Sequence, residues 1–370
     1  MRICIESSVL DHRRRSGLMT YGEGLVNSLF ENDRLNDYTL AYYSLSRKAE
    51  NMPGPSGENF RKEVFKVPDR EFFKRQYFID RFVLPKFFKT QQIDIFHRPA
   101  GYTMPLVKDV FKIMTVHDLR TLTIGDRFCV QNIGDYQTTM DSLDACVVVS
   151  ECTKQDVLKH FKIDEKKIKV IYLGADKRFQ PASQESIEET LNKYHLDEPF
   201  LLSLGSVPRK NIDGIIRGFA AAGSNKKTLL VLGCNMDVPK YAHLAETLGV
   251  LGRVRFLERL GDDEIVALYS SCKAFVFPSL YEGFGLPILE AMQCGAPVIT
   301  SNISSCPEVA GDSAMIVDPH HYQELGSAID TISTDTSYRN DLIQKGFKRA
   351  KLFSWDNFAQ EMKKVYALAQ

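Results

Sequence analysis

The feature that most constrains the fold is a rhythm of short β-branched runs, each followed by a stretch of helical character. The runs are ICIESSV, FKIMTVHDL, ACVVVS and KKIKVIYLG, and then FLLSLGS, KTLLVLG, VRFLERL, AFVFPS and PVITSN. Strands that alternate with helices predict βαβ units around a parallel sheet. Because the rhythm stops once and restarts, we predict an α/β protein with two doubly wound, Rossmann-like domains in tandem.

The interruption is the polar stretch RFQPASQESIEETLNKYHLDEP, which lacks a strand pattern. It places a domain boundary near Phe179 to Pro199. The length of 370 residues agrees with two domains, because one hydrophobic core rarely supports so long a chain. Ligands of doubly wound sheets bind at the carboxyl ends of the strands. With two facing sheets, we expect the site in the cleft between them.

Composition excludes several classes of protein. Lys plus Arg and Asp plus Glu each number 47, so no overall field favours nucleic acid. The eight cysteines form no C-x-x-C pair and no metal-binding set, which indicates reduced thiols and no metal site. The first apolar stretch is too short for a signal peptide, and no window reaches the length of a membrane span. We therefore expect a cytoplasmic protein.

The stretch PSLYEGFGLPILEAMQCGAPVIT, residues 278–300, places two acids around several turn-forming residues. AFVFPS predicts a buried strand and YEGFG its exit loop. Pro287 suits the first turn of the following helix, where a missing amide proton costs nothing. Gly295 is expected to end that helix in the left-handed conformation. Glu282 then lies in the loop and Glu290 in the helix, so both carboxylates can face one crevice.

This arrangement suits a polyhydroxylated, anionic ligand. The loop offers backbone amides at Phe284, Gly285 and Leu286 to an anion or a sugar hydroxyl. A carboxylate such as Glu290 can accept two hydrogen bonds from a ribose diol. A purely structural interpretation makes Glu290 a partner of the helix dipole and Glu282 a solvated loop acid.

The longer stretch from Pro278 to Pro319 resembles the C-terminal signature of the retaining GT-B glycosyltransferases of family 4 (group 1). The forms HDL, PRKN and SNISSCPEVAGD look most like the mannosyltransferase-type branch, which builds bacterial O-antigen and other polysaccharides. The resemblance implies that Glu290 holds the ribose hydroxyls of a nucleotide-sugar and that Glu282 faces the transferred sugar. It also implies donor contacts from the loop residues Gly283, Phe284, Gly285 and Leu286.

LSLGSVPRKNIDGIIRGF is similar to the phosphate-binding turn of the same family. Gly205 matches its glycine and Lys210 its lysine, a point charge suited to a diphosphate. Ser206 stands where many members carry arginine, so Arg209 is the expected second cation. A solvated Arg-Lys pair is the structural alternative, but cations at a helix N-terminus oppose the dipole and indicate a bound anion.

Two stretches of the first domain resemble further family elements. In KIMTVHDL, His117 follows a buried strand, and the resemblance implies contact with the donor sugar; the alternative is a histidine that only fixes its loop. In SGLMTYGEGLVNSLF, Gly17 matches the glycine that lets the backbone approach the diphosphate. The expected catalytic residues are thus His117, Glu282, Lys210 and Arg209.

The resemblance covers nearly the whole chain and implies a GT-B fold whose last helix crosses back to the first domain. Residues 1–178 with 355–370 would bind the acceptor, and residues 179–354 the nucleotide-sugar. The implied reaction is retaining sugar transfer without a metal or a cofactor beyond the nucleotide-sugar co-substrate. A nicotinamide dehydrogenase is disfavoured, because no G-x-G-x-x-G follows a predicted strand.

For the substrates, the resemblance gives GDP-mannose as the first expected donor and a lipid-linked saccharide as the acceptor, in surface polysaccharide synthesis. Transfer from a UDP- or ADP-sugar to a soluble sugar or glucan is one alternative. A non-catalytic protein that binds sugar nucleotides is another.

The segment FRKEVFKVPDREFFKRQYFIDRFVLPKFFK interleaves basic and aromatic residues. We expect a helix that begins near Asp69 and ends at Pro85. Residues 69–90 could rest on an anionic membrane. Alternatively its aromatic residues belong to the core, which we favour for most of them. The aromatic residues concerned are Phe73, Tyr77, Phe78 and Phe82.

Overall fold

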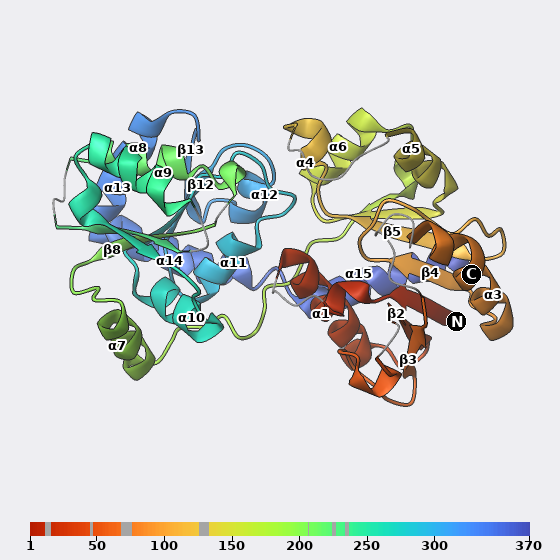
Figure 1. Ribbon diagram of the computed structural model, residues 1–370. Coiled ribbons are helices and arrows are strands. Elements are labelled where there is room, and N and C mark those ends of the chain that lie inside the picture. Colours follow the sequence, from red (N-terminus) through yellow and green to blue (C-terminus); the bar gives the residue numbers. More distant parts are fainter. Residues whose placement is uncertain are drawn as a thin grey trace. The chain divides into compact units, whose positions relative to one another are not determined.

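A computed structural model describes residues 1–11, 16–44, 47–67, 76–125, 133–205, 207–223, 227–233 and 237–370, with only the backbone for 133–135. The chain divides into two compact units (Figure 1). Unit 1 comprises Met1–Gly174 and Ser354–Gln370, and unit 2 comprises Ala175–Phe353. The last helix thus belongs to unit 1, and the division falls a few residues before Phe179.

Unit 1 is built on a seven-stranded sheet in which every pairing is parallel. The strands are β1 (Arg2–Glu6), β2 (Asp37–Tyr43), β3 (Phe60–Phe65), β4 (Ile95–Arg98), β5 (Phe111–Val116), β6 (Ala145–Val148) and β7 (Ile168–Val170). Their order is β3-β2-β1-β4-β5-β6-β7. On β1, Ile3 lies opposite Tyr38 of β2 and Ile95 of β4.

Unit 2 repeats this plan with six parallel strands in the order β10-β9-β8-β11-β12-β13. The strands are β8 (Phe200–Leu204), β9 (Leu229–Gly233), β10 (Val254–Leu257), β11 (Ala274–Phe277), β12 (Val298–Ser301) and β13 (Ala314–Val317). The central strands β9, β11 and β12 are buried along their whole length. Continuous burial is expected of parallel strands that carry helices on both faces.

Helices connect the strands in both units (Figure 1). Those of unit 1 are α1 (Gly17–Asn32), α3 (Leu84–Gln91), α4 (Arg120–Thr123), α5 (Ile133–Ser142), α6 (Glu151–His160) and α15 (Trp355–Tyr366), with the shorter turns η1 (Ser8–Asp11), η2 (Ala49–Asn51), η3 (Ile79–Val83), η4 (Glu165–Lys167) and η7 (Ala367–Ala369). Those of unit 2 are α7 (Gln184–Lys193), α8 (Ile212–Ala221), α9 (Val238–Thr247), α10 (Asp262–Ser271), α11 (Leu286–Gln293), α12 (Cys306–Ala310), α13 (Tyr322–Thr334) and α14 (Thr336–Ala350), with η5 (Pro208–Lys210) and η6 (Leu251–Arg253). The predicted class, two doubly wound α/β domains, is confirmed. Within the described ranges, no helix is long and apolar enough to cross a membrane.

The helical segment before β4 differs from the prediction. Residues 68–75, which include Asp69 and Phe73, lie outside the described part; beyond them the chain runs through the π-helical turn η3 directly into α3. Pro85 lies in the first turn of α3, so the prediction that it ends a helix is wrong. The hydrogen bonds of a π-turn join residues five apart, so the path continues past Pro85 without the amide proton that proline lacks.

The aromatic residues of this segment separate into buried and exposed members. Phe88 is buried and Phe78 packs against the core of unit 1. Tyr77 is 60% exposed and Phe82 is 57% exposed, so the prediction of core positions is wrong for these two. Helical geometry explains the split, because the turns of η3 and α3 direct one side toward the sheet and the other toward solvent.

The last helix, α15, packs against α1 of the same unit (Figure 1). Trp355 begins α15, and its indole ring lies against Gly24 of α1. A Cβ atom added at Gly24 would come within 2.3 Å of the ring of Trp355. The absence of a side chain at Gly24 is therefore what lets the two helices approach.

Gly24→Ala is expected to lower the free energy of unfolding of unit 1 by about 1–3 kcal/mol, because the methyl group overpacks the helix contact. Helix propensity alone would predict stabilisation by about 1 kcal/mol. Trp355 is the one tryptophan of the chain, so its fluorescence during urea unfolding reports on unit 1. Gly17→Ala on the same helix is the control, since a Cβ there meets nothing within 4 Å. Equal stability of the two variants would contradict the proposed packing.

Candidate active site

The strand order of unit 2 brings two loops together. Because β8 pairs with both β9 and β11, the order along the sheet changes direction between β8 and β11. The loop after β8 carries Arg209 and Lys210, and the loop after β11 carries Glu282. Both leave from carboxyl ends of adjacent parallel strands, the position where doubly wound sheets bind ligands. A backbone hydrogen bond of 2.8 Å from the amide of Leu280 to the carbonyl of Arg209 joins the loops.

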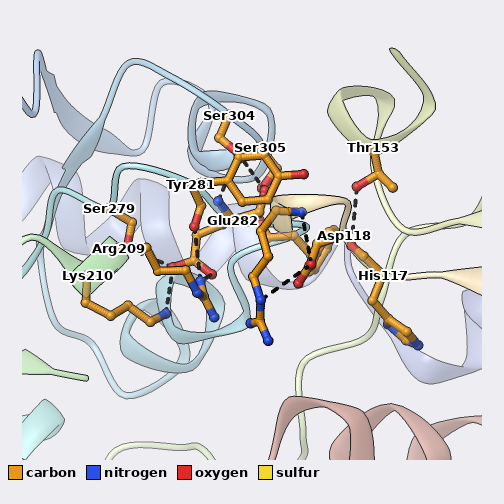
Figure 2. Close-up of polar contacts among 12 residues, drawn as sticks. His117, Asp118, Thr153, Arg209, Lys210, Ser279, Tyr281, Glu282, Ser304 and Ser305 are labelled. Carbon is orange, nitrogen blue, oxygen red and sulfur yellow. Dashed lines mark hydrogen bonds and ion pairs between the residues drawn. The ribbon is translucent and has the colours of Figure 1, made fainter. Parts of the chain in front are cut away.

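The carboxylate of Glu282 is the centre of the polar contacts in these loops, as Figure 2 shows. Lys210 donates from Nζ to Oε1 at 2.6 Å, and Arg209 donates from a guanidinium nitrogen to Oε2 at 2.6 Å. Ser279 donates to Oε1 at 2.7 Å. Arg209 also donates to the carbonyl of Tyr281 at 3.0 Å. The structure thus brings together three of the predicted catalytic residues.

The backbone of Glu282 is fixed from the loop after β12. Ser304 Oγ accepts from the amide of Glu282 at 2.9 Å and donates to its carbonyl at 2.5 Å. Ser305 lies within hydrogen-bonding distance of the carbonyls of Glu282, at 3.0 Å, and Phe284, at 2.7 Å. These serines were not predicted as site residues. The sequence signal is the run SNISS directly after a buried strand, since serines in such loops hydrogen-bond to nearby backbone.

Burial and charge act against each other in this cluster. Glu282 is 6% exposed, and burial by itself would raise its pKa, but Lys210 and then Arg209 outweigh burial and hold the pKa below its ordinary value. Burial lowers the pKa of Lys210, which Glu282 partly opposes. The three charged groups sum to one positive charge. Because a buried charge is costly without a counterion, such a site favours an anionic ligand.

Two residues explain the path of the loop after β8. Gly205 has φ of +146°, and a Cβ there would come within 2.5 Å of the side chain of Lys210, so only glycine fits beneath that side chain. Asn211 caps α8 in the left-handed conformation. Its amide group donates to the carbonyls of Pro278 at 3.2 Å and Pro319 at 2.7 Å. Asn211 therefore connects three loops at the carboxyl edge of the sheet. Ser206 lies outside the described residues.

The start of α11 has the geometry that the sequence predicted. Pro287 lies in its first turn, and Gly285, with φ of +107°, is the N-terminal cap. Within the described part of the chain, the amides of Gly285 and Leu286 have no hydrogen-bond partner, as is usual at a helix N-terminus. These amides and the adjacent Gly283 remain predicted donor contacts. The side chain of Phe284 has a structural contact, because its ring packs edge-on against Phe353.

Glu290 lies one turn further along α11 and is half-buried. Its charge acts on the neighbouring Tyr269 of α10 and Cys294, whose pKa values are raised first by burial and then by Glu290. The role of Glu290 toward a ribose stays a prediction.

In unit 1, His117 follows β5 and is held by its imidazole and by its backbone. Nε2 contacts the carbonyl oxygen of Pro99 at 2.7 Å, and the ring packs edge-on against Tyr21 with centroids 4.5 Å apart. Thr153 at the start of α6 donates to the carbonyl of His117 at 3.4 Å (Figure 2). Gly17 is the first residue of α1, and no atom of the described residues lies within 4 Å of a Cβ built there, so the described part of the chain gives no steric reason for glycine.

Unit 1 has a cavity of about 370 Å³ at the carboxyl ends of β1, β2 and β4. Aromatic side chains contribute to its wall, among them Tyr42 and Tyr102. Glu6 is buried beside it, and burial raises its pKa although Arg98 opposes this. Arg98 itself is paired with Asp80 at 2.6 Å. In the described part of both units, no group of three or more metal-ligating side chains has the geometry for a metal ion.

Two family models match the chain in succession. Glycosyltransferase Family 4 matches residues 37–179, and Glycosyl transferases group 1 matches residues 183–349. Among solved structures, the chain is similar to WaaG, a glycosyltransferase involved in lipopolysaccharide biosynthesis, with a TM-score of 0.72 and 16% identity over 98% of each chain. It is also similar to Anabaena HepE in complex with UDP and glucose, with a TM-score of 0.76 and 17% identity over 99% of each chain. These likenesses show that the fold is GT-B.

Curated relatives include enzymes of O-antigen assembly. The chain is 29% identical over 289 residues to O-antigen chain mannosyltransferase B of Escherichia coli, covering 74% of each chain. It is 29% identical over 364 residues to the serotype-specific mannosyltransferase WbdA of Escherichia coli, covering 90% of this chain and 43% of WbdA. The chain therefore spans less than half the length of that relative. O-antigen chain mannosyltransferase RfbU of Salmonella typhimurium is 29% identical over 262 residues, covering 70% of this chain and 69% of RfbU.

Glu282→Gln is expected to lower the free energy of unfolding of unit 2 by about 3 kcal/mol, because it leaves two partly buried cations without their buried anion. The control is Asp213→Asn, which removes an ion pair with Lys240 whose side chains are 47% and 53% exposed. That variant should lose less than about 1 kcal/mol. Denaturant unfolding followed by circular dichroism measures both.

The same deficit should depend on pH. The folded-state pKa of Glu282 is lowered from 4.5, so its contribution to stability is present above the unfolded pKa and is lost as pH falls through the folded value. The difference between wild type and Glu282→Gln should therefore be large at pH 7 and shrink in acid. A difference that stays constant with pH would show that Glu282 does not act as an ionised group.

Proposed function

The chain belongs to the family 4 (group 1) glycosyltransferases, and from this premise we propose that it transfers a hexose from a nucleotide-sugar to a saccharide acceptor with retention of anomeric configuration. The observation that carries the proposal is the cluster of buried Glu282 with the partly buried Arg209 and Lys210, which has one more cation than anion. It lies where the loops after β8 and β11 meet, beside the amides that begin α11. A nucleotide diphosphate supplies the missing negative charge.

The cluster also explains how the donor would be activated. When the bond between sugar and diphosphate breaks, negative charge grows on the departing phosphate. Lys210 and Arg209 are already held in place by Glu282, so they can stabilise that charge without reorganisation. The amides of Gly285 and Leu286 add partial positive charge from the N-terminus of α11. In this mechanism the two side-chain cations do the work that a metal ion does elsewhere.

Glu282 keeps room for the sugar itself. An ionised carboxylate has about four lone-pair directions, and Lys210, Arg209 and Ser279 occupy three of them. One direction is left to accept a hydrogen bond from a hydroxyl of the transferred sugar. A carboxylate held by two cations is a poor nucleophile, so we propose a front-face reaction in which the departing phosphate accepts the proton of the acceptor hydroxyl.

For the donor we propose GDP-mannose, because three of the similar curated proteins, the O-antigen and serotype-specific enzymes described above, are mannosyltransferases. The acceptor would be a lipid-linked saccharide in bacterial surface polysaccharide synthesis, used at the cytoplasmic side of the membrane. The alternatives are a UDP- or ADP-sugar donor with a soluble sugar or glucan acceptor, and a protein that binds sugar nucleotides without turnover. A UDP-sugar is the first alternative donor to test, because the similar protein HepE was solved in complex with UDP and glucose.

A panel of nucleotide sugars should raise the melting temperature of the wild-type protein selectively, with GDP-mannose giving the largest increase. Glu290→Ala should remove most of that increase, because the ribose diol loses its acceptor. The control is Glu188→Ala on the exposed side of α7, which should leave the increase unchanged. An equal increase in wild type and Glu290→Ala would refute the ribose role.

The donor selected in this way is then assayed for transfer in the presence of EDTA, and the product linkage is read by NMR. We expect turnover in the chelator and the anomeric configuration of the donor in the product. Strict dependence on a divalent ion would remove the role given to Lys210 and Arg209. Stabilisation by a donor without any transfer or hydrolysis would favour the binding-only alternative.

We further propose that unit 1 touches the membrane through residues 76–91, the helical segment that contains η3 and α3. Its exposed side carries the aromatic residues Tyr77 and Phe82. The basic residues Arg81, Lys86 and Lys89 are exposed on the same segment. Aromatic rings at the interface combined with cations suit an anionic lipid surface. This contact would bring a lipid-linked acceptor to the enzyme.

In flotation with vesicles that contain phosphatidylglycerol, the wild-type protein should bind and salt should weaken the binding. The double variant Tyr77→Ser/Phe82→Ser should lose most of it. Leu35→Ser, at a residue of unit 1 that is 87% exposed, is the control and should bind like wild type. If wild type does not float with anionic vesicles, the membrane contact is refuted while the transferase proposal stands.

A further inference from the structure

A chain of buried hydrogen bonds runs behind His117 in unit 1. The hydroxyl of Tyr21 on α1 lies 2.8 Å from Thr115 Oγ1 on β5. His97 on β4 contacts the same Oγ1 through Nε2 at 2.9 Å, and contacts the hydroxyl of Tyr366 on α15 through Nδ1 at 2.9 Å. Tyr21, His97 and Tyr366 are fully buried, and Thr115 is nearly so. Two strands and two helices are thereby joined at one point.

The groups in this chain of hydrogen bonds are uncharged, and their role is to hold one another in place. Burial, and then the proximity of His117, lowers the pKa of His97 to about 3, so its imidazole is neutral at physiological pH. Burial also raises the pKa of Tyr21 well above its ordinary value. Each hydroxyl can donate one hydrogen bond and accept others, so the chain is satisfied without an ion. It therefore fixes the position of the Tyr21 ring.

Among the described residues, the ring of Tyr21 is one of two groups in ring or hydrogen-bond contact with the imidazole of His117. The other is the carbonyl of Pro99, which can only accept a hydrogen bond, so Nε2 of His117 must carry the proton. Burial lowers the pKa of His117, against smaller opposing effects of Pro99 and the neighbouring Asp118. With Nε2 protonated and the ring neutral, Nδ1 keeps its lone pair. Within the described ranges, no group donates a hydrogen bond to Nδ1.

We propose that Tyr21, held by Thr115 and His97, is a positioning residue that fixes His117 as the Nε2–H tautomer and leaves Nδ1 to accept a hydrogen bond from a hydroxyl group of the transferred sugar. The inference rests on the proposed function for the identity of the ligand. Beyond that function, it assigns the contact to Nδ1 of His117 and gives this atom the role of hydrogen-bond acceptor. A neutral acceptor atom attracts a hydroxyl and repels the oxygens of a phosphate, so His117 would read the sugar and not the diphosphate.

The tautomer can be read without any substrate. Protein labelled with ¹⁵N-histidine is examined by long-range ¹H–¹⁵N NMR, and the signals of His117 are identified by their loss in His117→Gln. We expect the Nε2–H pattern at neutral pH, persisting below the ordinary histidine value of 6.5. Tyr21→Leu, which removes the ring, should give mixed tautomers or protonation at higher pH. Thr115→Val should shift the pattern in the same direction, and Thr115→Ser, which keeps the hydroxyl, should restore it.

Kinetics supply the second measurement. Tyr21→Phe keeps the ring and removes the hydroxyl, and should lower kcat about tenfold through misplacement of His117, with little change in KM for the donor. Tyr38→Phe is the matched control, since it removes another buried tyrosine hydroxyl, one that donates to Asp33 at 2.7 Å. It should destabilise the protein at least as much as Tyr21→Phe, because Tyr38 donates to a carboxylate, and it should leave kcat unchanged.

The NMR measurement tests the positioning role of Tyr21, and the transfer assay tests the proposed function. If wild type shows the Nδ1–H tautomer or a charged imidazole at neutral pH, or if Tyr21→Leu leaves the His117 signals unchanged, the positioning role is overturned even when transfer is observed. If no nucleotide-sugar is turned over, the proposed function fails, and the NMR result still decides whether Tyr21 fixes the tautomer.

Discussion

The constraint on which both units depend is that each parallel strand must be followed by a crossover connection that returns the chain to the opposite end of the sheet. Each return leaves from the carboxyl end of a strand, and where the strand order changes direction, two neighbouring loops cannot be covered by the same helix. In unit 2 this happens between β8 and β11, and in unit 1 between β1 and β4. The charged cluster around Glu282 and the cavity beside Glu6 lie at these two positions. The strand order thus determines where a binding site can form, whatever side chains line it.

The side chains then decide what each position can bind. Glu282 has a lowered pKa because two cations outweigh its burial, whereas burial prevails at Glu6 and raises its pKa. The difference lies in the cations. Lys210 and Arg209 both donate to Glu282, but the guanidinium of Arg98 is bound at two points by the carboxylate of Asp80. The same residue type therefore has a lowered pKa in unit 2 and a raised pKa in unit 1.

The sequence was sufficient for the fold class and for much of the loop after β11. Runs of β-branched residues revealed most strands, and Pro287 and Gly295 lie at the helix ends predicted for them because their backbone preferences are local. Pairing across loops is not local. That Lys210 and Arg209 share the carboxylate of Glu282 follows from the adjacency of β8 and β11, which no spacing along the chain encodes. The prediction that Pro85 ends a helix failed because the sequence does not show the π-turn that precedes it. That turn lets the helical path continue past a proline.

The hydrogen-bond chain from Tyr21 to Tyr366 shows the same limit at larger separation. His97 and Tyr366, which are in contact in this chain of hydrogen bonds, are 269 residues apart in the sequence. Each residue of the chain, taken alone, is an ordinary core residue. A tyrosine on an apolar helix face and a threonine in a strand carry no sign of function. They acquire one because α15 returns to unit 1 and presents Tyr366 to β4, so that a hydroxyl from the end of the chain completes a network that begins near its start. The return of the last helix therefore contributes more than packing area, because without Tyr366 the buried Nδ1 of His97 would lack the partner it has in this fold, and burying a polar atom unpaired is unfavourable.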